Sequence, residues 1–174
     1  MQGTRHKVSG PLTRDVVHNT MKLEIRQFPL AWRWTQASQA VFPDSVLAQL
    51  EPVEAGEAAD VNVRNRSSLE GQHLRDDLFR SIVHQDASTG AASEFLATLS
   101  IADATPVCLS WDGATALRTT WTIFRQYWGD FCYPASDDVS IAPEDESWLL
   151  LYFHWEQFEF GIKKEHNQSA HTTA

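Results

Sequence analysis

The segment from Trp148 to Trp155 constrains the fold more than any other part of this sequence. Alternate residues of a β-strand point to opposite faces of a sheet, and here both sets are mostly apolar. A strand that is apolar on both sides has to be covered on both sides, which places it in the interior of a sheet. A second strand is expected from Phe158 to Lys163, so that the two strands form a hairpin.

The rest of the chain contains patterns typical of both helices and strands. They predict helices at residues 44–49, 68–84, 88–100 and 112–128, an extended segment at 22–35, and strands at 61–63, 106–111 and 139–141. A length of 174 residues with 43% hydrophobic content suits one domain. We therefore predict a single α+β domain at residues 21–164, with a mainly antiparallel sheet that ends in the C-terminal hairpin and packs against about three helices. Residues 1–20 are expected to be a disordered arm or an extension, and residues 165–174 a polar tail.

Charge is distributed unevenly along the chain. The formal net charge is -9, and residues 86–174 hold thirteen acidic side chains against four basic ones. Affinity for nucleic acid comes largely from Lys and Arg contacts to phosphates, so we expect no nucleic-acid partner. A negative surface instead attracts a basic protein or a metal cation.

Neither a membrane segment nor a disulfide framework is indicated. No stretch approaches the ~18 apolar residues of a spanning helix, and residues 1–20 lack the apolar core of a signal peptide. We expect Cys108 and Cys132, which are far apart in sequence, to be buried and unreactive thiols in a reducing compartment, with a single bridge as the alternative. A cytoplasmic protein without a membrane partner is therefore predicted.

Residues 126–162 contain no lysine or arginine, yet they hold eight carboxylates and ten aromatic rings. Acidic side chains steer a cationic partner, and exposed rings beside them anchor it. The predicted partner-binding residues are five acids and three rings: Asp137, Asp138, Glu144, Asp145, Glu146, Trp111, Tyr133 and Trp155. The plainer explanation of the acids is a solvated loop with turns fixed by Asp137 or Asp138. A Ca²⁺ or Mg²⁺ site is a further alternative, although the spacing is not that of an EF-hand, and we assign no metal or cofactor.

His154 and Glu156 form the second candidate group. Residues two apart in a strand share a face, so this pair has the geometry for acid–base chemistry or for two metal ligands. Asp138 or His84 could approach it in the fold as a third group. The plainer explanation is a histidine that is hydrogen-bonded within the sheet. The sequence holds neither a nucleophile elbow nor a phosphate loop, and we assign no catalytic residue.

Three runs carry a resemblance to known proteins: Phe131-Cys-Tyr-Pro-Ala-Ser-Asp-Asp-Val, Trp148-Leu-Leu-Leu-Tyr-Phe-His-Trp-Glu and Phe158-Glu-Phe-Gly. They resemble the C-terminal pattern of small bacterial proteins of unknown function and, more loosely, the immunity proteins of bacterial toxin systems. The immunity proteins are compact and often acidic α+β domains. The resemblance implies a fold of this type, and it assigns a role to no individual residue.

The leading hypothesis is therefore a non-enzymatic acidic binding protein, in the form of an immunity-type inhibitor that neutralises a basic toxin enzyme by direct binding. The alternative is a hydrolase or metal-dependent enzyme that uses His154, Glu156 and loop carboxylates such as Asp138. A third hypothesis is a homodimer with its aromatic face buried between the subunits.

Overall fold

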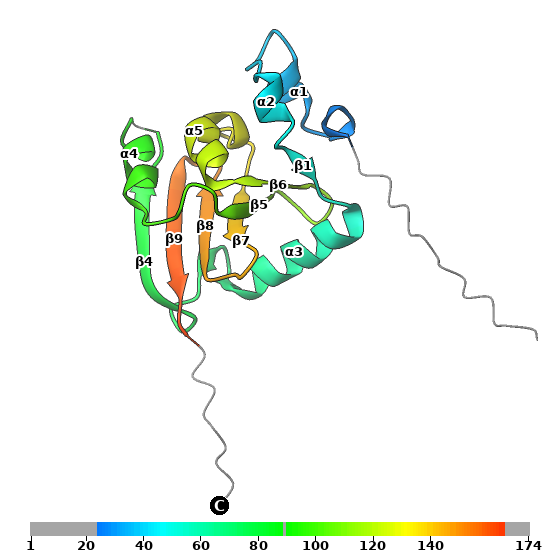
Figure 1. Cartoon of the computed structure of the whole chain (residues 1–174). Coiled ribbons are helices and arrows are strands. Elements are labelled where there is room, and N and C mark those ends of the chain that lie inside the picture. Colours follow the sequence, from blue (N-terminus) through cyan, green and yellow to red (C-terminus); the bar gives the residue numbers. More distant parts are fainter. Residues whose placement is uncertain (1–23, 89, 166–174) are drawn as a thin grey trace, which may run out of the picture.

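The computed structural model of this chain describes residues 24–88 and 90–165 (Figure 1). The predicted arm at residues 1–20 and nearly all of the predicted tail lie outside the described residues. Seven strands form one antiparallel sheet in the order β1-β6-β5-β7-β8-β9-β4. Their bounds are β1 (Glu51–Pro52), β4 (Phe79–Asp86), β5 (Pro106–Ser110), β6 (Ala116–Thr120), β7 (Val139–Pro143), β8 (Trp148–Phe153) and β9 (Gln157–Lys163). The predicted α+β domain with an antiparallel sheet and a terminal β8–β9 hairpin is confirmed.

Helices and one small hairpin complete the structure. The helices are α1 (Trp32–Thr35), α2 (Asp44–Leu47), α3 (Ala55–Ser67), α4 (Ala91–Thr98) and α5 (Trp121–Phe131), and a 3-10 turn spans Ile25–Gln27. A two-stranded sheet pairs β2 (Leu69–Glu70) with β3 (His73–Leu74). Among the described residues, no helix is both long and apolar enough to cross a bilayer.

Strand β8 lies inside the sheet, as its sequence predicts. All six of its residues are buried, and it pairs with β7 on one side and with β9 on the other. Leu150 contributes to a large cluster on one face of the sheet, whereas Leu149 and Leu151 belong to a separate cluster on the other face. The sheet is therefore covered on both faces.

The first face of the sheet is covered by α4, α5 and the segment around α1 (Figure 1). Its core is aromatic, with Trp34, Trp121, Phe124 and Phe131 fully buried. Their ring centroids lie 5–6 Å apart in tilted pairs, such as 5.1 Å for Trp34 and Phe131, which is the arrangement that aromatic quadrupoles favour.

The second face is covered by α3 and by the β2–β3 hairpin. Ala58 and Val61 of α3 pack on Cys108 and Ala116 of the sheet. Leu74 and Phe79 pack on β8, and a Cβ at Gly161 would lie only 2.7 Å from the Phe79 ring. Glycine at this position therefore allows the hairpin region to approach the sheet closely.

Several predicted elements are confirmed, while others are wrong for identifiable reasons. The helices at 44–49 and 88–100 and the strands at 106–111 and 139–141 exist with slightly different ends. Of the predicted extended segment at 22–35, residues 22 and 23 lie outside the described residues, and the rest contains the 3-10 turn and α1 instead, with Trp34 turned inward to donate its indole N–H to the Asp130 carbonyl at 3.0 Å. The strand at 61–63 lies inside α3, whose residues Ala58, Val61 and Asn65 face inward at helical spacing.

The predicted helices at 68–84 and 112–128 are wrong over most or part of their length. Gly71, with a φ of 64°, makes the turn between β2 and β3, so Leu74 belongs to β3, and the apolar residues from Phe79 to Val83 belong to β4. The Asp112 carboxylate accepts hydrogen bonds from two following backbone amides, both at 2.7 Å, and so forms a turn rather than a helix cap. Strand β6 follows, and α5 starts only at Trp121, where Thr120 is the N-cap.

Candidate functional site

The eight residues predicted to bind a partner lie at the two opposite ends of β7. Tyr133, Asp137 and Asp138 precede this strand, whereas Glu144, Asp145 and Glu146 form the turn that follows it. Because five strand residues span about 16 Å, the two groups are separate surfaces. Trp111 and Trp155 follow the ends of β5 and β8, which run antiparallel to β7, and therefore lie at the end that holds Asp138.

Asp137 is a structural residue that holds the loop before β7. It is 7% exposed, its two oxygens lie 2.5 and 3.0 Å from the Arg33 guanidinium, and it accepts a hydrogen bond from the Tyr133 amide at 3.0 Å. Burial acts to raise the pKa of Asp137, but the hydrogen bonds from Arg33, Tyr133 and Ser136 outweigh it and lower the pKa. This carboxylate therefore does not face a partner.

The acids of the β7–β8 turn are largely compensated by basic residues from other elements. Glu146 lies 3.1 Å from both Arg64 of α3 and Lys163 of β9, and Glu144 lies 3.9 Å from Arg118 of β6. Asp145 accepts a hydrogen bond from the Ser147 amide at 3.0 Å. None of the three basic partners, Arg64, Arg118 and Lys163, could be identified from the local sequence, because they come from other elements of the fold.

The opposite end of β7 carries exposed aromatic rings, and we call it the aromatic end: Trp32, Trp111, Tyr133, Asp138, His154 and Trp155. Trp155 is 41% exposed and stacks on Phe153 with centroids 4.5 Å apart. Trp32 is 37% exposed and meets Tyr133 edge-on at 5.9 Å. The Ala135 amide donates to the His154 carbonyl at 2.8 Å, which ties the loop before β7 to the residues that follow β8.

Trp111 and Tyr133 are only half-buried members of this end. The Trp111 indole N–H donates to the Phe131 carbonyl at 3.2 Å, and the Tyr133 hydroxyl donates to the Gln39 side chain at 3.2 Å. The Arg33 guanidinium covers the Tyr133 ring at 4.2 Å. Trp32 is not among the predicted partner-binding residues, and its contact with Tyr133 is what places it in this surface.

His154 pairs with Asp138 and not with Glu156. The Nδ1 atom of His154 lies 2.9 Å from Oδ1 of Asp138, which also accepts a hydrogen bond from the His154 backbone amide at 3.0 Å. Glu156 adopts a positive φ of 63° in the turn to β9. Among the described residues no group of three or more His, Cys, Asp or Glu side chains is placed to hold a metal ion. Both side chains of this histidine–carboxylate pair are about half exposed, so solvent reaches them.

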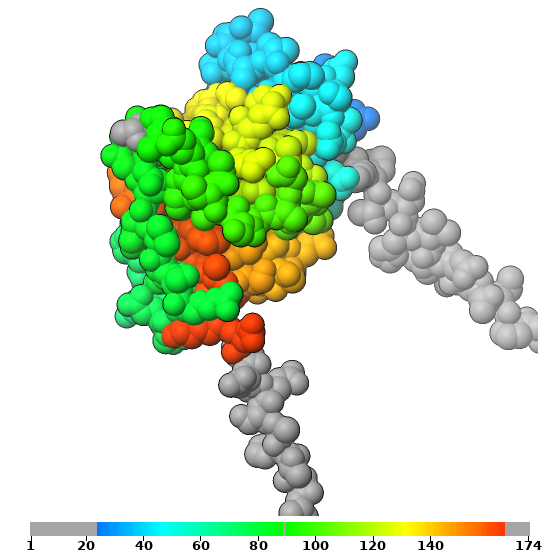
Figure 2. Space-filling model, turned by 60° about the vertical axis from the view of Figure 1, so that its left-hand side comes forward, coloured from blue at the N-terminus to red at the C-terminus, as the bar shows by residue number. Residues whose placement is uncertain are grey.

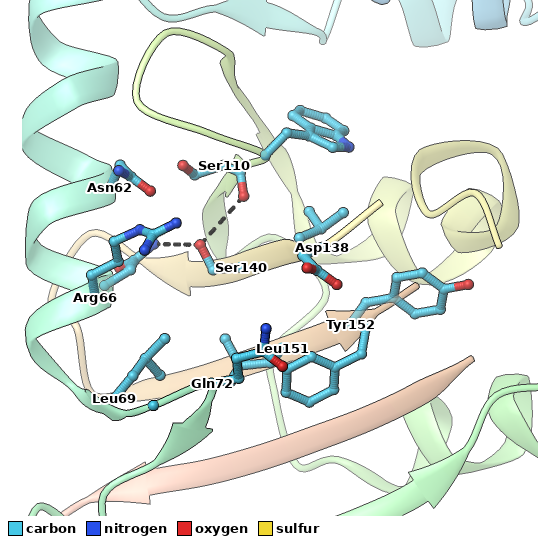
Figure 3. Close-up of a pocket in the computed structure, with 14 residues that line it drawn as sticks. Asn62, Arg66, Leu69, Gln72, Ser110, Asp138, Ser140, Leu151 and Tyr152 are labelled. Atoms are coloured by element: carbon cyan, nitrogen blue, oxygen red, sulfur yellow. Dashed lines mark hydrogen bonds between the residues drawn. The ribbon is translucent and has the colours of Figure 1, made fainter. Parts of the chain in front are cut away.

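A pocket of about 150 Å³ lies beside the aromatic end, between α3, the β2–β3 turn and the second face of the sheet (Figure 3). Its polar lining comes from Asn62, Arg66, Gln72, Ser110, Asp138 and Ser140. Ser140 Oγ accepts a hydrogen bond from the Asn65 amide at 2.8 Å and donates to the Ser110 carbonyl at 3.4 Å. A space of this volume holds a group the size of a small ring. Four separate segments build the pocket, so no local sequence pattern indicated it.

Both cysteines are free and buried, which confirms the expectation of buried thiols. Burial raises the pKa of Cys108 to about 11 and raises that of Cys132 well above its ordinary value. Neither thiol is therefore an activated nucleophile.

We compared the chain with protein-family models, with curated proteins and with solved structures, and no match was found in any of the three comparisons.

Proposed function

We propose that this chain is a non-enzymatic binding protein and that it recognises a basic protein partner at the aromatic end. The observation that carries the proposal is the exposure of Trp32 and Trp155 at the end that also holds the half-exposed carboxylate of Asp138. Arg33, which lies next to Trp32, is 5% exposed and committed to Asp137. The surface thus offers two aromatic anchors and a carboxylate, which is the combination that binds Lys- and Arg-rich surfaces.

The overall charge supports the same partner class. Residues 24–165 hold 22 acidic and only ten basic side chains, and six of the basic ones are engaged in ion pairs with acids. The excess of acid attracts a cationic protein over distances up to the Debye length, which is about 8 Å at physiological salt. An immunity-type inhibitor of a basic toxin enzyme in the cytoplasm is the specific form of this proposal, and the resemblance of the C-terminal runs supports it.

The test compares the two ends of β7. The partner is first captured from the source cell with the wild-type chain, and its affinity is then measured for Trp32→Ala, Trp155→Ala and Asp138→Lys. Each tryptophan truncation is expected to weaken binding about 30-fold, as anchors worth about 2 kcal/mol do. The matched control, Glu144→Lys with Asp145→Lys, changes more charge at the other end and should slow association only slightly. Full affinity of both tryptophan variants would refute this surface.

A hydrolase or metal-dependent enzyme is the second candidate, and the hydrogen-bonded His154–Asp138 pair at the rim of the pocket favours it. In this function His154 acts as the general base and Asp138 orients its ring. The discriminating measurements are the metal content of protein purified without chelators and the hydrolysis of a panel of ester, amide and phosphate substrates. An activity that is lost in both His154→Ala and Asp138→Asn, while partner binding is retained, would favour the enzyme over the binding protein.

A further inference from the structure

The two edges of the seven-stranded sheet are built differently. At one edge, β1 contains only two residues, one of which is Pro52, and this edge is too short to pair with another strand. At the other edge, β4 contains eight residues and no proline or glycine. No strand of the described residues pairs with its outer side (Figure 1), and Figure 2 shows β4 and α4 in green on the side of the molecule that comes forward.

The backbone of β4 directs alternate groups outward. The Ala87 amide donates to the Glu156 carbonyl of the β8–β9 turn at 2.7 Å. The backbone groups of every second residue in a strand point to the same side, so those of Gln85 and Val83 also point toward β9. The amides and carbonyls of Ile82, His84 and Asp86 therefore point away from β9. The Asp86 carbonyl accepts a hydrogen bond from the Gln85 side-chain amide at 3.1 Å, whereas no strand of the described residues pairs with the outward groups of Ile82 and His84. Such backbone groups in a long edge strand are a template for another strand.

We propose that a second copy of this chain fills the edge, so that two β4 strands pair antiparallel about a two-fold axis at Val83 and join two sheets into one. In this register Ile82 of one copy faces His84 of the other, and these two symmetric pairs form four backbone hydrogen bonds. Val83 of one copy lies opposite Val83 of the other in a pair without hydrogen bonds, and in such pairs the side chains approach most closely. Its side chain is 46% exposed in the single chain, and the second copy covers it.

Charge selects this register over its neighbours. Arg80 and Asp86 lie three residues on either side of Val83, so a two-fold axis at Val83 places Arg80 of each copy opposite Asp86 of the other. Within one chain these side chains are about 20 Å apart along the strand and cannot pair. An axis at Ile82 would place Arg80 opposite His84, and an axis at His84 would place Asp86 opposite Ile82, so both lose the two ion pairs.

Both charges are available for this contact. Arg80 is exposed and has no ion-pair partner among the described residues, and it lies at the irregularity between Phe79 and Ser81 in the β4–β9 register. Among the described residues, the Asp86 carboxylate accepts hydrogen bonds from the Ser88 amide at 2.8 Å and from the Ser88 hydroxyl at 2.6 Å, both at Oδ1. These hydrogen bonds lower the pKa of Asp86, so it is ionised at neutral pH. None of the β4 residues in this interface belongs to the aromatic end, so the two proposals rest on different residues.

Charge reversal tests the register directly. The mass of the wild-type chain in solution is expected to change from monomer to dimer over a dilution series. Arg80→Asp and Asp86→Arg each place two like-charge pairs in the interface and should weaken the dimer at least tenfold, whereas the double variant restores both pairs and should recover the affinity. Arg26→Asp, an exposed reversal elsewhere, is the control and should have no effect.

A cross-link provides a second measurement that does not depend on charge. Strand pairs without hydrogen bonds have Cα atoms about 4.5 Å apart, within the range of a disulfide, so Val83→Cys should form a covalent dimer on mild oxidation. Val63→Cys, at a more exposed site on α3, should not. A chain that is monomeric at all concentrations, a dimer indifferent to both reversals, or the absence of a Val83→Cys cross-link would each overturn the proposal.

Discussion

The two faces of the sheet are covered by different kinds of material. Under α5 and α1 the core consists of large rings that are sealed from solvent. Under α3 and the β2–β3 hairpin, two smaller apolar clusters lie beside the 1% exposed carboxylate of Glu159 and the pocket next to Ser140. We therefore expect the aromatic face to supply most of the stability, because it buries more apolar surface, whereas the polar face contains the pocket and its hydrogen-bonding groups.

The largest expected effect is on the aromatic face. Phe124 is fully buried and packs against Trp121 and Phe131, so Phe124→Ala should lower the free energy of unfolding by about 3–5 kcal/mol, as measured by chemical denaturation. Val63→Ala, at a 65% exposed site on α3, serves as the control and should change it by less than about 0.5 kcal/mol. A cost below about 1 kcal/mol for Phe124→Ala would show that the aromatic face is not the main source of stability.

The next effect concerns the ion pair between Arg33 and Asp137, which is polar although it borders the aromatic core. Asp137→Asn leaves Arg33 buried without its counter-ion and should cost about 3 kcal/mol at pH 7. Because the pKa of Asp137 is lowered in the folded chain, its contribution is present above the unfolded pKa of about 3.9 and is lost as the pH falls below it. Denaturation curves at pH 7 and pH 3 should therefore differ less for the variant than for the wild type, and an unchanged difference would contradict this assignment.

On the polar face, the equivalent position is Glu159. Its Oε1 accepts a hydrogen bond from the Leu74 amide at 2.8 Å, and its Oε2 lies 2.7 Å from Nδ1 of His73. Glu159→Ala leaves the buried amide without a partner and should cost about 1–3 kcal/mol. Glu159→Gln keeps an acceptor oxygen and should cost clearly less in the same denaturation experiment. If the two variants lost the same free energy of unfolding, the hydrogen bond between the Leu74 amide and Glu159 would not be what holds the hairpin on the sheet.

The smallest expected effect is a difference in thiol labelling rate between the two faces of the sheet. Cys108 lies on the polar face and is 8% exposed, whereas Cys132 lies in the aromatic cluster and is 1% exposed. A thiol reagent should modify both slowly at pH 8, because burial raises both pKa values, but it should modify Cys108 first. Mass spectrometry of the native chain after timed labelling gives the order, and faster labelling of Cys132 would show that the aromatic face opens more readily than the polar one.

The fold could be predicted where local pattern and tertiary packing agree. Strand β8 has two apolar faces, which only an interior position in a sheet covered on both sides accommodates. The prediction failed at β4, because Leu74, Leu78 and Ile82 happen to follow a helical spacing although Gly71 and the β2–β3 pairing interrupt it. For local patterns of this kind only the tertiary structure decides.

The candidate site was predictable only in part. The approach of Asp138 to His154 was one of the options that the sequence left open, and the structure contains that contact. The compensation of the acids was not predictable, since Arg33, Arg64 and Arg118 reach Asp137, Glu146 and Glu144 from segments distant in sequence or from a different strand. The pocket next to Ser140 requires four such segments at once.

The position of β4 in the sheet has a consequence for biosynthesis. Val83 pairs with Phe160, so β4 leaves the ribosome long before the strand that it needs. During that interval both sides of an eight-residue strand stay open, and the nascent polypeptide has to be kept from aggregating until β9 is translated. Because of this strand order, we expect the chain to fold slowly, to complete its sheet only late in synthesis, and to need a chaperone that holds the nascent chain.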